Sequence, residues 1–174
     1  MTGSKILRML LAAIMCINIL ALAGCKNDLP PYESVVSAID TYRTNYSEYR
    51  KTDPDDMMSY DMPETARLDG TPCSSYYIRS GNDLFRSVTL EYEKNDTMMV
   101  DEYFYLTDNA FFIVNSYLDD ETMTPVITRY YVWKGKLYNI DEENSQLTEA
   151  DDTASAQYYL SFDKLEKEYG PQSR

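Results

Sequence analysis

Paired carboxylates are the side chains of this sequence best suited to acid–base chemistry. Glu91 and Glu93 stand two positions apart, and Asp101 and Glu102 are adjacent. Two carboxylates that flank a glycosidic bond can hydrolyse it, one as the acid and the other as base or nucleophile. The chain holds 29 acidic residues, so such neighbours are expected by chance. We therefore predict no catalytic residues, and an enzyme with an acidic site is kept only as an alternative.

Histidine is absent from the sequence, and its absence excludes several kinds of catalysis. Serine or cysteine nucleophiles activated by histidine are ruled out, as are metal sites with histidine ligands. Ser161 and Lys164 fit the S-x-x-K pattern of penicillin-recognising serine enzymes, but no K-T-G follows them. Serine is also a favoured residue at the start of a helix, and this is how we interpret Ser161.

An acidic segment near the C-terminus suggests calcium binding. Asp141, Glu143, Glu149 and Asp152 can be aligned with a 12-residue calcium loop, but Gln146 stands where the loop requires glycine for its sharp turn. A solvated acidic loop is the better interpretation. The sequence predicts no metal site and no cofactor.

The tetrapeptide Leu22-Ala23-Gly24-Cys25 closes a short apolar run that two basic residues precede. The run is too short for a comfortable membrane span, which needs ~20 apolar residues, and its flanks are those of a secretory signal. The segment resembles a bacterial lipoprotein signal peptide with its lipobox. In that family, cleavage follows the residue at Gly24, and the thiol at Cys25 is linked to diacylglycerol.

The resemblance implies an address and a division of the chain. Residues 1–24 are the signal peptide, residues 25–31 the lipidated cysteine and a tether of at most ~20 Å, and residues 32–174 a single α+β domain. The domain is expected at the extracytoplasmic face of the cell membrane, held there by its lipid anchor. Its short tether favours a membrane or envelope protein as partner.

Cysteine and charge further restrict the exported chain. Cys73 is the one thiol left free after cleavage and lipidation, so no intramolecular disulfide can form. Such a residue is more often a small buried hydrophobic side chain than a reactive thiol. The cleaved chain keeps 14 basic residues against 29 acidic ones, a net charge of about −15. Nucleic acid is excluded as a partner, because its binding depends on basic contacts.

A helix is predicted over residues 32–50. Apolar and tyrosine side chains recur there at intervals of three and four, from Val35 to Tyr49. A core-facing stripe is the commoner explanation, and a partner-binding stripe is the alternative.

Residues 51–72 read as a long connecting loop, with a short strand possible near residues 64–68. A short C-terminal helix ends near Tyr169 with Gly170 as its cap, whereas residues 153–160 fit either a helix or a strand.

Between these helices the sequence changes to a β pattern. Six runs are separated by short turn segments, at residues 76–79, 84–91, 98–106, 110–118, 126–133 and 137–140. Such short connections permit antiparallel neighbours but not parallel crossovers. The predicted fold is α+β, an antiparallel meander of about six strands with the N-terminal helix packed on one face.

Aromatic residues are the feature most suited to recognition. The chain has 17 tyrosines, and tyrosine combines rigid apolar area with a hydroxyl group. Five aromatic residues on strands expected to be neighbours form a possible binding face: Tyr103, Tyr105, Tyr117, Tyr131 and Trp133. The alternative is that these rings fill both faces of a small sheet.

These observations favour a membrane-anchored extracytoplasmic lipoprotein that acts as a binding or accessory module. A carrier that holds an apolar ligand in a curled sheet is the second hypothesis, and it would resemble half-barrel lipoprotein carriers in architecture only. An enzyme with an unrecognised acidic site is the third.

Overall fold

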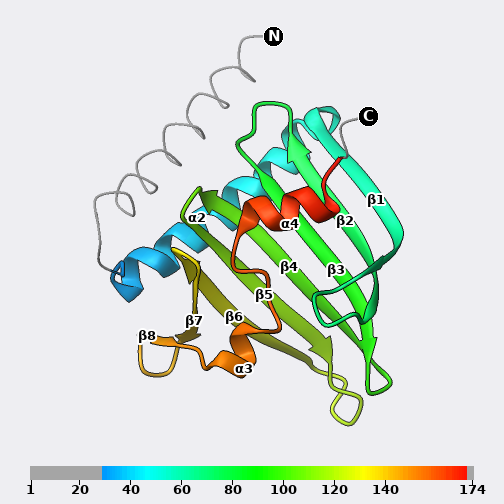
Figure 1. Cartoon of the computed structure of the whole chain (residues 1–174). Helices are drawn as coiled ribbons and strands as arrows, with labels where there is room; N and C mark the ends of the chain where they lie inside the picture. The colour runs from blue at the N-terminus through cyan, green and yellow to red at the C-terminus, as the bar shows by residue number, and fades with distance from the viewer. Residues whose placement is uncertain (1–28, 172–174) are drawn as a thin grey trace.

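Eight antiparallel strands form one sheet, in which each strand pairs with the next strand of the chain (Figure 1). The computed structural model describes residues 29–171, and every structural statement below concerns them. The strands are β1 Met57–Ala66, β2 Pro72–Ser80, β3 Arg86–Lys94, β4 Thr97–Thr107, β5 Ala110–Leu118, β6 Pro125–Trp133, β7 Lys136–Asp141 and β8 Gln146–Glu149. The α+β class and the antiparallel meander are thus as predicted.

The prediction of six strands was wrong, because β1 and β8 lie in segments that read as loops. These two strands are the edges of the sheet. All ten residues of β1 are exposed or half-buried, so β1 lacks the alternation of buried and exposed positions that reveals a strand. β8 has four residues and pairs only with β7. Both strands are held by backbone pairing more than by side-chain burial.

Tight turns fix the register of the meander. Asn95 and Asp96 both have positive φ, as do Lys134 and Gly135. These are the two-residue connections of β3–β4 and β6–β7, where positive φ at both positions matches the right-handed twist of the strands.

Helix α2, Tyr32–Thr52, crosses one face of the sheet (Figure 1). Tyr42 is buried at the centre of this contact, with its ring edge-on to Phe104 and Phe112 at centroid distances of 5.9 and 5.6 Å. Phe104 and Phe112 stack on one another at 4.7 Å. Aromatic pairs in these geometries stabilise beyond their buried area, so the tyrosine stripe of α2 is a core element.

The C-terminal segment covers the opposite face. It contains the short helix α3, Asp152–Ser155, and helix α4, Phe162–Tyr169. Leu165 and Tyr169 are fully buried in this second cluster. Gly170 caps α4 with an extended backbone, not a left-handed one; a Cβ at this position would overlap the Glu166 carbonyl oxygen. Glycine is needed there for close approach.

Helix α2 leaves part of its own face of the sheet open. Beyond Glu102, towards the β3–β4 turn, Met98 is 58% exposed; on the neighbouring strands Leu118 is 44% exposed and Ile127 is 53% exposed. All three residues lie on the α2 side, since they alternate with residues of the opposite cluster and share the parity of Phe104, Phe112 and Tyr131.

Among residues 29–171, no helix combines the length and apolar character that a membrane span requires.

Candidate functional site

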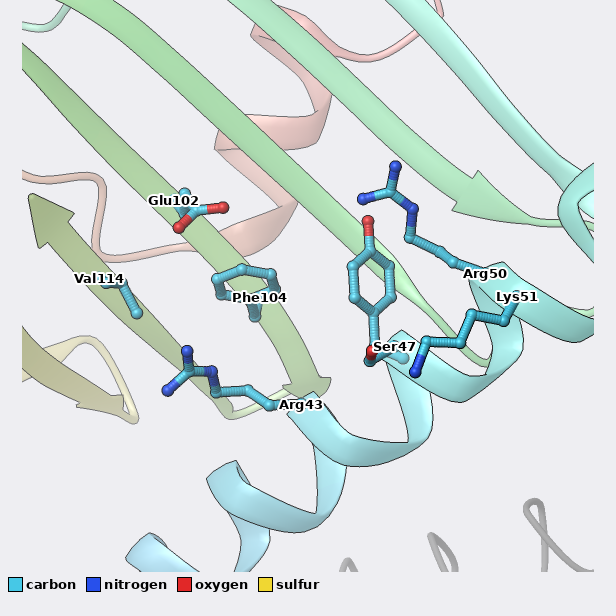
Figure 2. Close-up of a pocket in the computed structure, with 8 residues that line it drawn as sticks. Arg43, Ser47, Arg50, Lys51, Glu102, Phe104 and Val114 are labelled. Atoms are coloured by element: carbon cyan, nitrogen blue, oxygen red, sulfur yellow. The ribbon is translucent and has the colours of Figure 1, made fainter.

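A groove of about 540 Å³ lies where α2 meets the open part of the sheet (Figure 2). Helix α2 supplies one wall, and strands β4 and β5 supply the floor and the other wall. Eight residues line it: Arg43, Tyr46, Ser47, Arg50, Lys51, Glu102, Phe104 and Val114.

The helix wall of the groove is basic. Arg43, Ser47 and Arg50 follow one another at intervals of four and three, which places them on one side of α2. The buried tyrosine stripe fixes the rotation of the helix, so this side is turned towards the opening of the groove. Lys51 adds a third cation, although it pairs with exposed Glu48 at 3.0 Å. Within residues 29–171, neither Arg43 nor Arg50 forms an ion pair.

The floor of the groove is aromatic and apolar. Phe104 and Val114 are buried against α2, and Tyr46 lies edge-on to Phe104 at 6.2 Å. The Arg50 guanidinium lies 5.8 Å from the centre of the Tyr46 ring. Burial raises the pKa of Tyr46 above its usual range. The site therefore presents fixed positive charge beside a flat apolar surface.

Glu102 is the one carboxylate among the eight lining residues. Burial raises the pKa of this carboxyl, and the nearby Arg43 opposes the rise. Figure 2 shows Glu102 on β4, facing the groove across from the basic residues of α2. A half-buried carboxyl of this kind can remain protonated at a higher pH than usual and then donate a hydrogen bond to a ligand.

The two carboxylate pairs of the sequence lie in different arrangements on the sheet. Asp101 and Glu102 are adjacent on β4, so their side chains point to opposite faces of the sheet and cannot act on one bond. Glu91 and Glu93 share the α2 side of β3; Glu91 accepts a hydrogen bond from Tyr76 at 3.3 Å, and Glu93 is exposed.

Asp101 belongs instead to a buried polar network on the α4 side. Its carboxylate accepts hydrogen bonds from Arg67 at 2.9 Å, Asn115 at 2.6 Å and Tyr92 at 3.3 Å. The Arg67 guanidinium lies 3.9 Å from the centre of the Tyr92 ring and also donates to the Gln157 carbonyl at 3.1 Å. These bonds join the β1–β2 connection, three strands and the C-terminal segment. We assign this network to stability.

The five aromatic residues suggested as a binding face are divided between the two sides of the sheet. Tyr131 and Trp133 are buried in the α2 cluster, whereas Tyr103 is buried in the opposite cluster. Tyr105 is half-buried on the α4 side, under the Arg86 guanidinium at 3.6 Å, and half-buried Tyr117 pairs with Met99 on that side. The structure thus does not bring these side chains together on one surface.

The remaining motif residues have structural partners. Ser161 is the N-cap of α4, with its hydroxyl oxygen 3.5 Å from the Lys164 amide. Asp141 accepts hydrogen bonds from the side chain and backbone of Asn144, and Glu149 pairs with Lys136 at 2.8 Å. No cluster of three or more potential metal ligands occurs in the described part of the chain.

Cys73 is buried, and burial raises the pKa of its thiol. Gly24 and Cys25, the predicted cleavage and lipidation site, lie outside the described residues.

Sequence reasoning missed the groove, although its signal was present. Arg43, Arg50 and Lys51 lie in the C-terminal half of α2, where the helix dipole alone is enough to favour cations. The overlooked signal is that Arg43 and Arg50 lie on the same side of the helix. This pattern indicates a groove only when it is known which part of the sheet the helix leaves open.

Comparison with known proteins adds no name to this geometry. No protein-family model, curated protein or solved structure matches the chain.

Proposed function

We propose that this protein is a lipid-anchored extracytoplasmic binding protein and that the basic groove beside α2 is its binding site. The observation that carries the proposal is the concentration of Arg43, Arg50 and Lys51 along one groove of a chain whose sequence has a net charge of −13. An acidic protein repels anions over most of its surface, so a local basic groove selects where an anionic ligand or partner group can bind.

A binding role fits the groove better than catalysis does. Hydrolysis by paired carboxylates requires two acids on either side of the reacting bond, and the lining of this groove contributes only Glu102. Arginine binds anionic groups through several fixed donors, and the aromatic floor offers contact area without chemistry.

The anchoring part of the proposal has its own test. Exchange of Cys25→Ser removes the thiol that would carry the lipid, so the protein should lose processing and membrane association. Unchanged processing and membrane retention of this variant would contradict lipidation. Cys73→Ser is the matched control, and it should leave both properties as they are.

The binding part is tested by site-specific photo-crosslinking in intact membranes. A photoreactive amino acid at Ser47, inside the groove, should give a covalent adduct that mass spectrometry detects. The same amino acid at Asp120, on the exposed β5–β6 connection, is the control. Adding Arg43→Glu and Arg50→Glu should abolish the Ser47 adduct. Equal adducts at both positions, or an adduct that persists after charge reversal, would refute the groove as the binding site.

A further inference from the structure

The open part of the α2-side face continues directly from the groove. We give the name apolar strip to the exposed residues Met98, Leu118 and Ile127, together with half-buried Val100 and, at the groove end, buried Val114. Large exposed apolar residues that gather in this way mark a binding surface more often than scattered single residues do.

Strand register places the strip next to the basic residues. Val114 lies in the groove and pairs with Glu102 on β4. One step of two residues further from α2, Val100 pairs with Ser116, which pairs with Ile127. From Glu102 to Met98 the strand advances four residues, about 13 Å. The strip is therefore a narrow apolar path that leads away from the groove.

Charge gives this path a direction. Arg43 and Arg50 stand at the end beside α2, whereas Glu91 and Glu93 flank the strip on β3. A ligand that uses the whole surface needs a negative group at one end and an apolar chain behind it. A cationic group would be repelled by the arginines at the groove.

We infer that the groove and the apolar strip together bind an anionic amphiphile: a carboxylate or phosphate-monoester head group beside Arg43 and Arg50, and a single acyl chain along the strip. The inference rests on the proposed function and names the ligand class of the same site. A free fatty acid and a lysolipid phosphate share this chemistry, and they differ in the head group.

The raised pKa of Glu102 is consistent with this arrangement. A protonated Glu102 adds no negative charge beside the head group and can donate a hydrogen bond to it. The pairing of Arg129 with Glu142 at 2.6 Å neutralises the cation on the other side of Val114. Arg129 therefore adds no unpaired cation at the entrance of the strip.

Native mass spectrometry of the full-length protein in a non-ionic detergent tests the inference. Dodecanoate and dodecyl phosphate are the two probes, and the better binder identifies the head group. Dodecyltrimethylammonium has the same chain with the opposite charge, and inorganic phosphate has charge without a chain. We expect one molecule of an anionic probe to be retained per protein, and neither control to bind. The apparent affinity should rise about two- to fourfold for each added methylene.

Variants locate the bound probe. Arg43→Gln with Arg50→Gln should weaken binding about tenfold, because charge-assisted hydrogen bonds are lost. Ile127→Asp should weaken it to a similar degree through the chain. Lys94→Gln and Met123→Asp are matched exposed controls outside the surface, and they should bind as the unaltered protein does.

Two results would overturn the inference. Equal binding of the anionic and cationic amphiphiles would mean that the arginines do not select the head group. Failure of both anionic probes to bind, while the Ser47 crosslink still depends on Arg43 and Arg50, would refute the amphiphile and leave the binding function standing. Loss of that crosslink specificity would instead refute the proposed function itself.

Discussion

Removal of one partner from the Arg67–Asp101 pair should destabilise the protein in a way that depends on pH. The side chains are 3% and 0% exposed, and their closest atoms are 2.9 Å apart. Arg67→Met leaves the Asp101 carboxylate buried without its cation, a situation that costs ~3–5 kcal/mol of unfolding free energy. Loss of the guanidinium contact with the Tyr92 ring accounts for ~1–2 kcal/mol of this cost.

The sign of the pH dependence follows from Asp101. Burial already raises the pKa of its carboxyl in the folded protein, and loss of Arg67 raises that pKa further. A carboxyl with a raised folded pKa takes up its proton more readily in the folded state than in the unfolded state, where its pKa is about 3.9. The destabilisation by Arg67→Met should therefore be largest at neutral pH and shrink as the pH falls towards 4.

Urea unfolding followed by the fluorescence of Trp133 measures both effects. Trp133 is the single tryptophan of the chain and is buried, so its emission reports global unfolding. At pH 7.5 we expect Arg67→Met to cost ~3–5 kcal/mol, and at pH 5.0 at least ~1 kcal/mol less, the equivalent of about one pKa unit.

Asp101→Asn is the matched control for the pH dependence. It removes the buried counter-ion of the Arg67 guanidinium and leaves only the exposed Asp69, 3.3 Å away, and arginine does not titrate in this range. Its cost should be similar in size and constant between pH 5.0 and 7.5. A pH-independent cost for Arg67→Met, or a cost below ~1 kcal/mol at pH 7.5, would refute the view that this pair is a buried and mutually dependent charge pair.

Three further predictions concern packing. Phe112→Ala should lower the unfolding free energy measured in urea by ~3–5 kcal/mol, because it empties the centre of the α2 core. Met123→Ala, at a 67% exposed position, should change it very little. Similar costs for the two variants would contradict the assigned core. Gly170→Ala should lower the unfolding free energy by ~1–3 kcal/mol, because its Cβ overlaps a backbone carbonyl. Gly70→Ala should cost less, since a Cβ there has open space and only the positive φ of 83° is strained. The reverse order would contradict the capping geometry. Cys73 should react with maleimide at pH 7 only after urea unfolding, because its thiol is buried and its pKa is raised; rapid labelling of the native protein, measured on the peptide that contains Cys73, would show that this site opens.

The sequence predicted the parts of the fold that have a strong period or a strong turn signal. The six central runs coincide with β2 to β7, and the helix expected over residues 32–50 is α2, Tyr32–Thr52. Arg86 alternates in step with Val88 and Leu90, which places a charged residue on the apolar side of β3. It lies there in the structure, because it pairs with Glu166 at 3.0 Å and covers the Tyr105 ring. Its charge is satisfied by a helix 80 residues further along the chain, which local pattern cannot reveal.

The site was harder to predict than the fold because it depends on what is left uncovered. Phe104 and Met98 share one side of β4, yet α2 buries the first and leaves the second exposed. Neighbouring sequence does not distinguish these two positions. Likewise, Arg43 is one residue from buried Tyr42, and only the rotation of the packed helix shows that it faces a groove.

The order in which the two sides of the sheet are closed has a consequence for biosynthesis. Helix α2 precedes every strand and can shield its side as soon as the hairpins form, whereas the opposite side waits for Phe162, Leu165 and Tyr169. A nascent chain that still lacks these last residues presents a complete sheet with a bare, tyrosine-rich surface. Such an intermediate is prone to self-association, so loss of a few C-terminal residues should be more harmful to the yield of soluble protein than their small number implies.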